Sequence, residues 1–122
     1  MGSRISIAVR QNNGESVFLY SHWAGPRIAE DLQLALKRQQ RWDDAPYLTR
    51  IIFCQMVKNS LMDETGFGIT NEDCGDYPVM FIEPSTREIH VGEARWTFKQ
   101  FIEMDWHEVA DTIMGIYKKD RG

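Results

Sequence analysis

The sequence predicts an α+β fold: an antiparallel sheet of four or five strands with helices packed on one face, in the order ββααβ(β)βα. Three observations lead to this prediction. The chain begins with alternating apolar and polar residues, continues with apolar residues at helical spacing, and returns to short strands before a closing helix. A chain of 122 residues is long enough for one compact core, so residues 1–122 are expected to form a single domain.

The first element is a β-hairpin. Strand Arg4–Arg10 alternates isoleucine and valine with polar or small residues, which is the period of a half-buried strand. Asn13-Gly14 lies at the centre of a turn, and a second strand is expected from Ser16 to Tyr20.

A helix from Pro26 to about Gln40 follows the hairpin. Proline at the first helical position loses no hydrogen bond that the helix needs. Ile28, Leu32 and Leu36 recur at intervals of four residues and form one apolar stripe.

The second helix begins near Asp44 and is expected to run to Met62 as the most buried element. Asp44 is an N-cap residue, and Pro46 fits the first turn. Apolar residues from Tyr47 onward cover most of its circumference, with Ile52 and Met56 in the core.

The second half predicts a loop, a hairpin and two helices. Loop 63–76 holds five acidic residues, and residues 67–70 could form a short edge strand. Strands 77–83 and 87–93 pair around a turn, with Val79, Phe81, Ile89 and Val91 on the core face. Thr97 and Gln100 fit a capping box, and a closing helix ends near Lys119.

Composition excludes several classes of protein. The net charge of −4 argues against nucleic acid as a partner, because a phosphate backbone requires a basic surface. The longest apolar run is four residues, so neither a signal peptide nor a membrane span is expected, and the location predicted is cytoplasmic. Cys54 and Cys74 do not suggest a disulfide framework, and the spacing of cysteine and histidine predicts no metal site and no cofactor.

The strongest candidate site is the turn after the second strand. It brings together Ser21, His22, Trp23, Gly25 and Arg27 at the start of the first helix, where free N–H groups attract anions. The rings could stack on a base, and Arg27 could bind a phosphate. The alternative is that the indole only anchors the strand to the helix.

Arg41, Trp42 and Arg50 form the second candidate, around the start of the second helix. A guanidinium beside an indole could hold an anion, whereas a tryptophan that covers the gap between two helices is the more common arrangement. Arg50 is expected within a buried helix, so it needs a partner, either a loop carboxylate or an anionic ligand.

No residue pattern predicts catalysis. No nucleophile elbow, phosphate loop or dinucleotide fingerprint is present, and no catalytic residue is assigned. The acids of loop 63–76 lack the spacing of a calcium-binding loop, so a solvated loop is favoured.

Several segments resemble a family of small uncharacterised proteins encoded by bacteriophages and prophages. The resemblance rests on Leu19–Gly25, Arg41–Asp44 through Ile52, and Glu64–Ile69, and extends to the first residues and to Trp96–Ile102. It implies an accessory protein in the cytoplasm of a bacterial host, of the kind that often counters host defences.

Three functions follow as hypotheses. The first is a non-catalytic, homo-oligomeric protein that binds a small phosphate-bearing, nucleotide-derived signal and sequesters it. The second is a protein inhibitor whose acidic surface binds a host defence or CRISPR protein. The third is a small hydrolase or transferase, for which the sequence offers no nucleophile and base.

Overall fold

A six-stranded mixed sheet and four α-helices make up the protein in a computed structural model that describes residues 3–121. The α+β class predicted from the sequence is confirmed. In chain order the elements are β1 (Ile5–Arg10), β2 (Ser16–Ser21), the 3-10 turn η1 (Gly25–Arg27), α1 (Ile28–Lys37), α2 (Ala45–Val57), β3 (Phe67–Thr70), β4 (Met80–Glu83), β5 (Glu88–Val91), β6 (Ala94–Thr97), α3 (Phe98–Glu103) and α4 (Trp106–Arg121).

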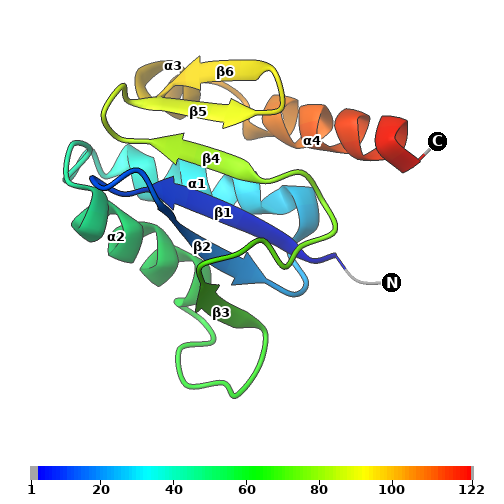
Figure 1. Cartoon of the computed structure of the whole chain (residues 1–122), viewed down its shortest axis with the longest axis horizontal. Helices are drawn as coiled ribbons and strands as arrows, with labels where there is room; N and C mark the ends of the chain where they lie inside the picture. The colour runs from blue at the N-terminus through cyan, green and yellow to red at the C-terminus, as the bar shows by residue number, and fades with distance from the viewer. Residues whose placement is uncertain (1–2, 122) are drawn as a thin grey trace.

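The strand order β3-β2-β1-β4-β5-β6 differs from the predicted sheet (Figure 1). Strands β1 and β4 are parallel at the centre, whereas every other neighbouring pair is antiparallel. The prediction of four or five antiparallel strands was therefore wrong in number and in direction. The edge strand predicted at residues 67–70 is present as β3, and β6 was not predicted.

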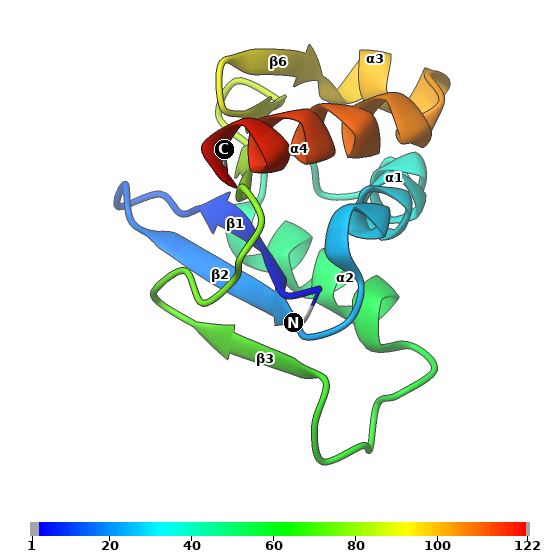
Figure 2. The same cartoon turned by 90° about the vertical axis from the view of Figure 1, so that its right-hand side faces the viewer.

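Helices α1 and α2 lie on one face of the sheet, as expected (Figures 1 and 2). Strand residues that face these helices are fully buried. They are Ile5, Ile7, Val9, Leu19, Met80, Ile82, Ile89 and Val91. Helix α4 packs on α1 and η1, and its Tyr117 ring stacks on Tyr77 at a centroid distance of 4.3 Å.

On the other face, which we call the open face, Phe18 and Phe81 pack edge to face with centroids 6.5 Å apart. Phe81 was predicted to face the core, and this was wrong. The register aligns Phe81 with Ala8 of β1, so Met80 and Ile82 point to the helices instead.

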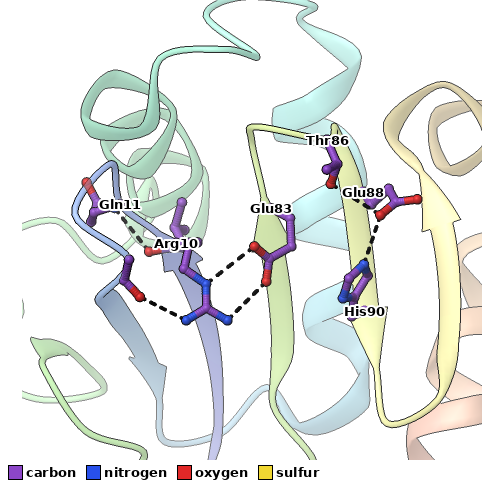
Figure 3. A network of polar contacts seen from close by, with 8 residues as sticks. Arg10, Gln11, Glu83, Thr86, Glu88 and His90 are labelled. Atoms are coloured by element: carbon purple, nitrogen blue, oxygen red, sulfur yellow. Dashed lines mark hydrogen bonds and ion pairs between the residues drawn. The ribbon is translucent and has the colours of Figure 1, made fainter.

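A salt bridge on the open face joins the two parallel strands (Figure 3). Arg10 donates from Nε and Nη2 to the two carboxylate oxygens of Glu83, at 3.3 and 3.2 Å. Its third nitrogen donates to the carbonyl of Gly14, and the guanidinium lies 5.9 Å from the Phe81 ring. Parallel pairing between β1 and β4 is therefore supported by side chains as well as by the ladder.

Two predicted helix starts are confirmed by their caps. The Asp44 carboxylate accepts a hydrogen bond from Tyr47 N–H at the start of α2. Thr97 and Gln100 form both hydrogen bonds of a capping box at the start of α3.

The end predicted for α2 was wrong, because the helix stops at Val57 rather than Met62. Asn59 and Ser60 follow, both poor helix formers, and Ser60 N–H closes a turn on the Val57 carbonyl. Leu61 and Met62 consequently lie in a loop with 71% and 91% of their surface exposed. Within residues 3–121, no helix has the length and apolar character to cross a membrane.

Candidate functional site

Five segments meet around a cavity of about 290 Å³ beside the turn that follows β2. We call it the Trp23 pocket. It is lined by Ser21, Trp23, Ala24, Arg27, Asp31, Gln55, Met56, Lys58, Asn59, Ser60 and Phe67.

The Trp23 indole forms an exposed wall of this pocket, with 61% of its surface accessible. Beneath the ring lies Gly66, where an added Cβ would be 2.5 Å from a ring carbon of Trp23. His22 contacts the indole edge to face at 5.2 Å and shares a 2.8 Å hydrogen bond between its Nδ1 and the Tyr20 hydroxyl. The wall is therefore held by a glycine and an imidazole, while much of the indole remains open to solvent.

The polar groups of this turn form hydrogen bonds with other groups of the protein. The Ser21 hydroxyl is buried and accepts a hydrogen bond from Ala24 N–H at 3.2 Å. Gly25 N–H donates to the carbonyl of Ser3 at 2.7 Å, and Gly25 has the positive φ of +56° that favours glycine. The amides of His22, Ala24 and Gly25 are thus already hydrogen-bonded, so positive side chains must supply most of the attraction for an anion.

Two cations and one carboxylate supply the charge of the pocket. Arg27 is the last residue of η1, and Lys58 lies at the end of α2, and neither forms a salt bridge within residues 3–121. Burial, helped by the charge of Glu30, raises the pKa of the Asp31 carboxyl, while Arg27 and Lys58 oppose this shift. The pocket therefore holds an excess of one positive charge when Asp31 is ionised.

Arg41 and Trp42 lie at the other end of α1, about 15 Å away for a helix of ten residues. Trp42 donates from Nε1 to the Leu36 carbonyl at 3.1 Å and packs on Phe98 at 5.5 Å. Arg41 lies over the Tyr47 ring at 4.7 Å and forms a 3.6 Å ion pair with Asp44. Trp42 is an anchor between elements here.

Three non-glycine residues with positive φ gather at this junction. Gln39, Arg41 and Arg87 have φ values of 53°, 58° and 56°, and all three line one shallow hollow with Trp42. The carboxylates of Asp43 and Asp44 pair with the arginines of this hollow. Asp43 accepts two hydrogen bonds from Arg87, and Asp44 forms an ion pair with Arg41. The cations of the hollow are therefore neutralised by the chain itself.

Arg50 is exposed, so the prediction that it lies within a buried part of the helix was wrong. It points away from the core side of α2, lines a shallow hollow with Arg41 and Tyr47, and lies 3.9 Å from Cys54 Sγ. An exposed guanidinium needs no carboxylate partner, so the argument that burial demands one does not apply.

The structure thus separates the predicted site residues into two groups. Ser21, His22, Trp23, Gly25 and Arg27 lie in or beside the Trp23 pocket, whereas Arg41, Trp42 and Arg50 lie at the α1–α2 junction. Sequence reasoning missed Asp31 and Lys58, and it considered Phe67 only within the segment Glu64–Ile69, without placing that segment beside this turn. The sequence shows an acidic residue, Asp31, in the first turns of the predicted helix. No local sequence pattern indicates that the end of α2 lies beside the turn after β2.

Comparisons with family models, with curated proteins and with solved structures give no match to this chain. Within residues 3–121, no three histidine, cysteine, aspartate or glutamate side chains form a group that could hold a metal ion.

Proposed function

We propose that the protein binds a small phosphate-bearing ligand in the Trp23 pocket without transforming it. The observation that carries this proposal is an exposed indole wall beside two cations, Arg27 and Lys58, that have no carboxylate partner at salt-bridge distance among residues 3–121. Flat aromatic surfaces stack on bases, and paired cations bind phosphate. A nucleotide combines both features.

The size of the pocket limits the ligand. A cavity of about 290 Å³ is at the lower end of the range for small-molecule sites, which is about 300–1,000 Å³. One mononucleotide, with its base on the exposed indole and its phosphate beside the two cations, is therefore the largest ligand for one pocket. A larger nucleotide signal would need two pockets, which supports the prediction that the protein acts as a homo-oligomer.

The biological setting proposed is that of a phage accessory protein in a bacterial host. It is supported by the resemblance of the LYSHWAG and ETGFGI segments to phage and prophage proteins. In that setting the ligand is a nucleotide-derived defence signal, and sequestering it suppresses the defence.

Mass spectrometry of bound small molecules tests the proposal first. The protein is purified from phage-infected, defence-positive cells and denatured, and the released molecules are identified. A phosphate-bearing molecule recovered intact, at near-stoichiometric amount, supports binding without catalysis. Recovery of cleaved product alone would point to the hydrolase hypothesis.

Substituting one cationic residue at a time, inside and outside the pocket, locates the site. Calorimetry with adenosine monophosphate compares Arg27→Met and Lys58→Met with Arg50→Met, which removes the same charge in the middle of α2, outside the pocket. Loss of one charged hydrogen bond weakens binding by about 1.5–3 kcal/mol. We expect this loss for Arg27→Met and Lys58→Met only. An equal loss for Arg50→Met alone would move the site to the α1–α2 junction.

The pH dependence of binding provides a second readout. A phosphate beside Asp31 disfavours its ionised form, so binding and protonation of Asp31 favour one another. Affinity should therefore rise as the pH falls toward the raised pKa of Asp31, and Asp31→Asn should remove this dependence.

A further inference from the structure

The strand β3 ends the sheet and leaves part of its backbone unpaired. In the part of the chain that the structure describes, its only neighbour is β2. His22 N–H donates to the Gly66 carbonyl, and residues along an antiparallel strand alternate in facing the neighbour. The backbone N–H and C=O groups of Gly66, Gly68 and Thr70 therefore face β2, whereas those of Phe67 and Ile69 face away from the sheet.

This edge lacks the features that usually block strand pairing. Proteins protect exposed edges with prolines, lysines, bulges or a covering helix. Phe67–Thr70 contains no proline and no charged residue. The loop between α2 and β3 extends away from the body of the molecule beside the edge, not across it (Figure 2).

Exposed apolar side chains occur on β3 and on the segments that adjoin it. Among the residues that the structure describes, six large hydrophobic side chains are exposed, and four of them belong to β3 or to the segments next to it: Trp23, Leu61, Met62 and Ile69. Ile69 is 61% exposed although it is a strand residue, and Trp23 contacts Gly66 at the start of the strand. Grouped exposed apolar residues mark a protein-binding surface more often than scattered ones do.

The charge on both sides of the edge is negative and uncompensated. Asp63 and Glu64 precede β3, and Glu72 and Asp73 follow it, all exposed and without a salt bridge within residues 3–121. The sequence has no lysine, arginine or histidine from residue 59 to residue 86.

We propose that β3 binds an extended segment of a partner protein that carries lysine or arginine at both ends and an apolar residue beside Ile69. Main-chain hydrogen bonds to Phe67 and Ile69 supply the pairing, and the four carboxylates select the basic ends. This interaction surface goes beyond the binding of a small ligand and does not depend on it.

The same charges argue against a second copy of the chain as the occupant. In a twofold antiparallel pairing, Phe67 would lie opposite the second copy's Ile69. Counting outward along both strands then places Glu64 opposite Glu72 and Asp63 opposite Asp73. Like charges directly opposite one another destabilise a strand pair.

A synthetic peptide tests the proposal. It has alternating valine and threonine at its centre, two lysines at each end and a fluorescent label. At low ionic strength we expect saturable binding by anisotropy, and slower hydrogen exchange at the amides of Phe67 and Ile69. Raising the salt concentration should weaken the complex, since exposed charges are screened.

Two sets of variants separate charge from main-chain pairing. The variant with Glu64→Gln, Glu72→Gln and Asp73→Asn should lose affinity by roughly tenfold, because three exposed ion pairs are removed. The control with Glu93→Gln, Glu103→Gln and Asp111→Asn changes the net charge equally on exposed residues elsewhere and should change affinity by less than about twofold.

The N–H that Ile69→Pro removes faces away from β2 and forms no hydrogen bond of the β2–β3 ladder, so the fold should survive while peptide binding is lost. Ile69→Thr keeps the N–H and should retain most of the affinity. Each of four results would overturn the proposal: no binding at low salt, equal binding of a peptide with glutamate ends, binding unaffected by Ile69→Pro, or dimerisation that protects the β3 amides without peptide.

Discussion

Replacing Gly66 by alanine should displace the Trp23 ring and destabilise the protein for two separable reasons. The backbone of Gly66 has a φ of +105°, a conformation that side-chain-bearing residues rarely adopt, at a cost of about 1–3 kcal/mol. The new Cβ would also lie 2.5 Å from a carbon of Trp23, whereas carbon atoms in contact prefer about 3.5–4.0 Å. The ring must therefore move by about 1 Å.

Gly14→Ala is the matched control for the backbone term. Gly14 has a φ of +89°, and an added Cβ there would meet no atom within 4 Å. Because Trp23 can turn toward solvent, the clash should add about 1 kcal/mol, at the lower end of overpacking costs. Gly66→Ala should therefore cost about 1 kcal/mol more than Gly14→Ala.

Urea denaturation followed by circular dichroism measures both free energies of unfolding without relying on tryptophan fluorescence. Repeating Gly66→Ala in a Trp23→Ala background completes a double-mutant cycle, in which the extra cost should disappear. Equal costs for Gly66→Ala and Gly14→Ala, together with additivity in the cycle, would refute the contact between ring and glycine.

Three further predictions concern stability. Ser6→Ala should leave stability unchanged or raise it by about 1 kcal/mol, because the buried Ser6 Oγ has no hydrogen-bond partner in residues 3–121, whereas Ser21→Ala should lower it by about 1 kcal/mol through loss of the Ala24 cap. Thermal melts of the two variants give the comparison. Trp42→Ala should lower the free energy of unfolding by about 2–4 kcal/mol and Trp23→Ala by less than about 1 kcal/mol. The reverse order in a denaturation experiment would show that Trp23, not Trp42, is the structural anchor. Burial raises the pKa of Asp31 above 3.8, so its contribution to stability is full below pH 3.8 and is lost as the pH rises through its folded-state pKa. A titration of stability should show that Asp31→Asn removes this component, and an unchanged pH profile would contradict it.

Local signals in the sequence were sufficient for the caps and for the first hairpin. Asp44 and Thr97 act within one helical turn of their own positions, and the Asn-Gly turn joins adjacent strands, so neighbouring residues contain all the information required. The same reasoning singled out Trp23 beside a helix start but left open whether the indole is a binding surface or an anchor, and its exposure is known only from the structure.

Interactions between distant segments were not accessible to that reasoning. The parallel pairing of β1 with β4 joins residues more than 70 positions apart, and periodicity defines the faces of a strand but not its neighbour. Phe81 shows the consequence: residues Val79–Ile82 are all apolar, so alternation alone does not choose between Phe81 and its neighbours, and only the position of β4 beside β1 places Met80 and Ile82 against the helices. Lys58 reaches the Trp23 pocket for a similar reason, through the antiparallel packing of α2 on α1.

Phe67 connects the two proposed binding surfaces. Its side chain lines the Trp23 pocket, while its backbone groups face the free edge of β3. A strand that pairs with this backbone restricts the position of the side chain, so occupancy of one surface should change the affinity of the other. Thermodynamic linkage requires the change to be reciprocal: adenosine monophosphate must alter peptide affinity by the same factor as peptide alters adenosine monophosphate affinity. Titrations of each in the presence of saturating amounts of the other measure both factors. A factor of about one in both directions would show that the edge binds its partner without moving the pocket wall.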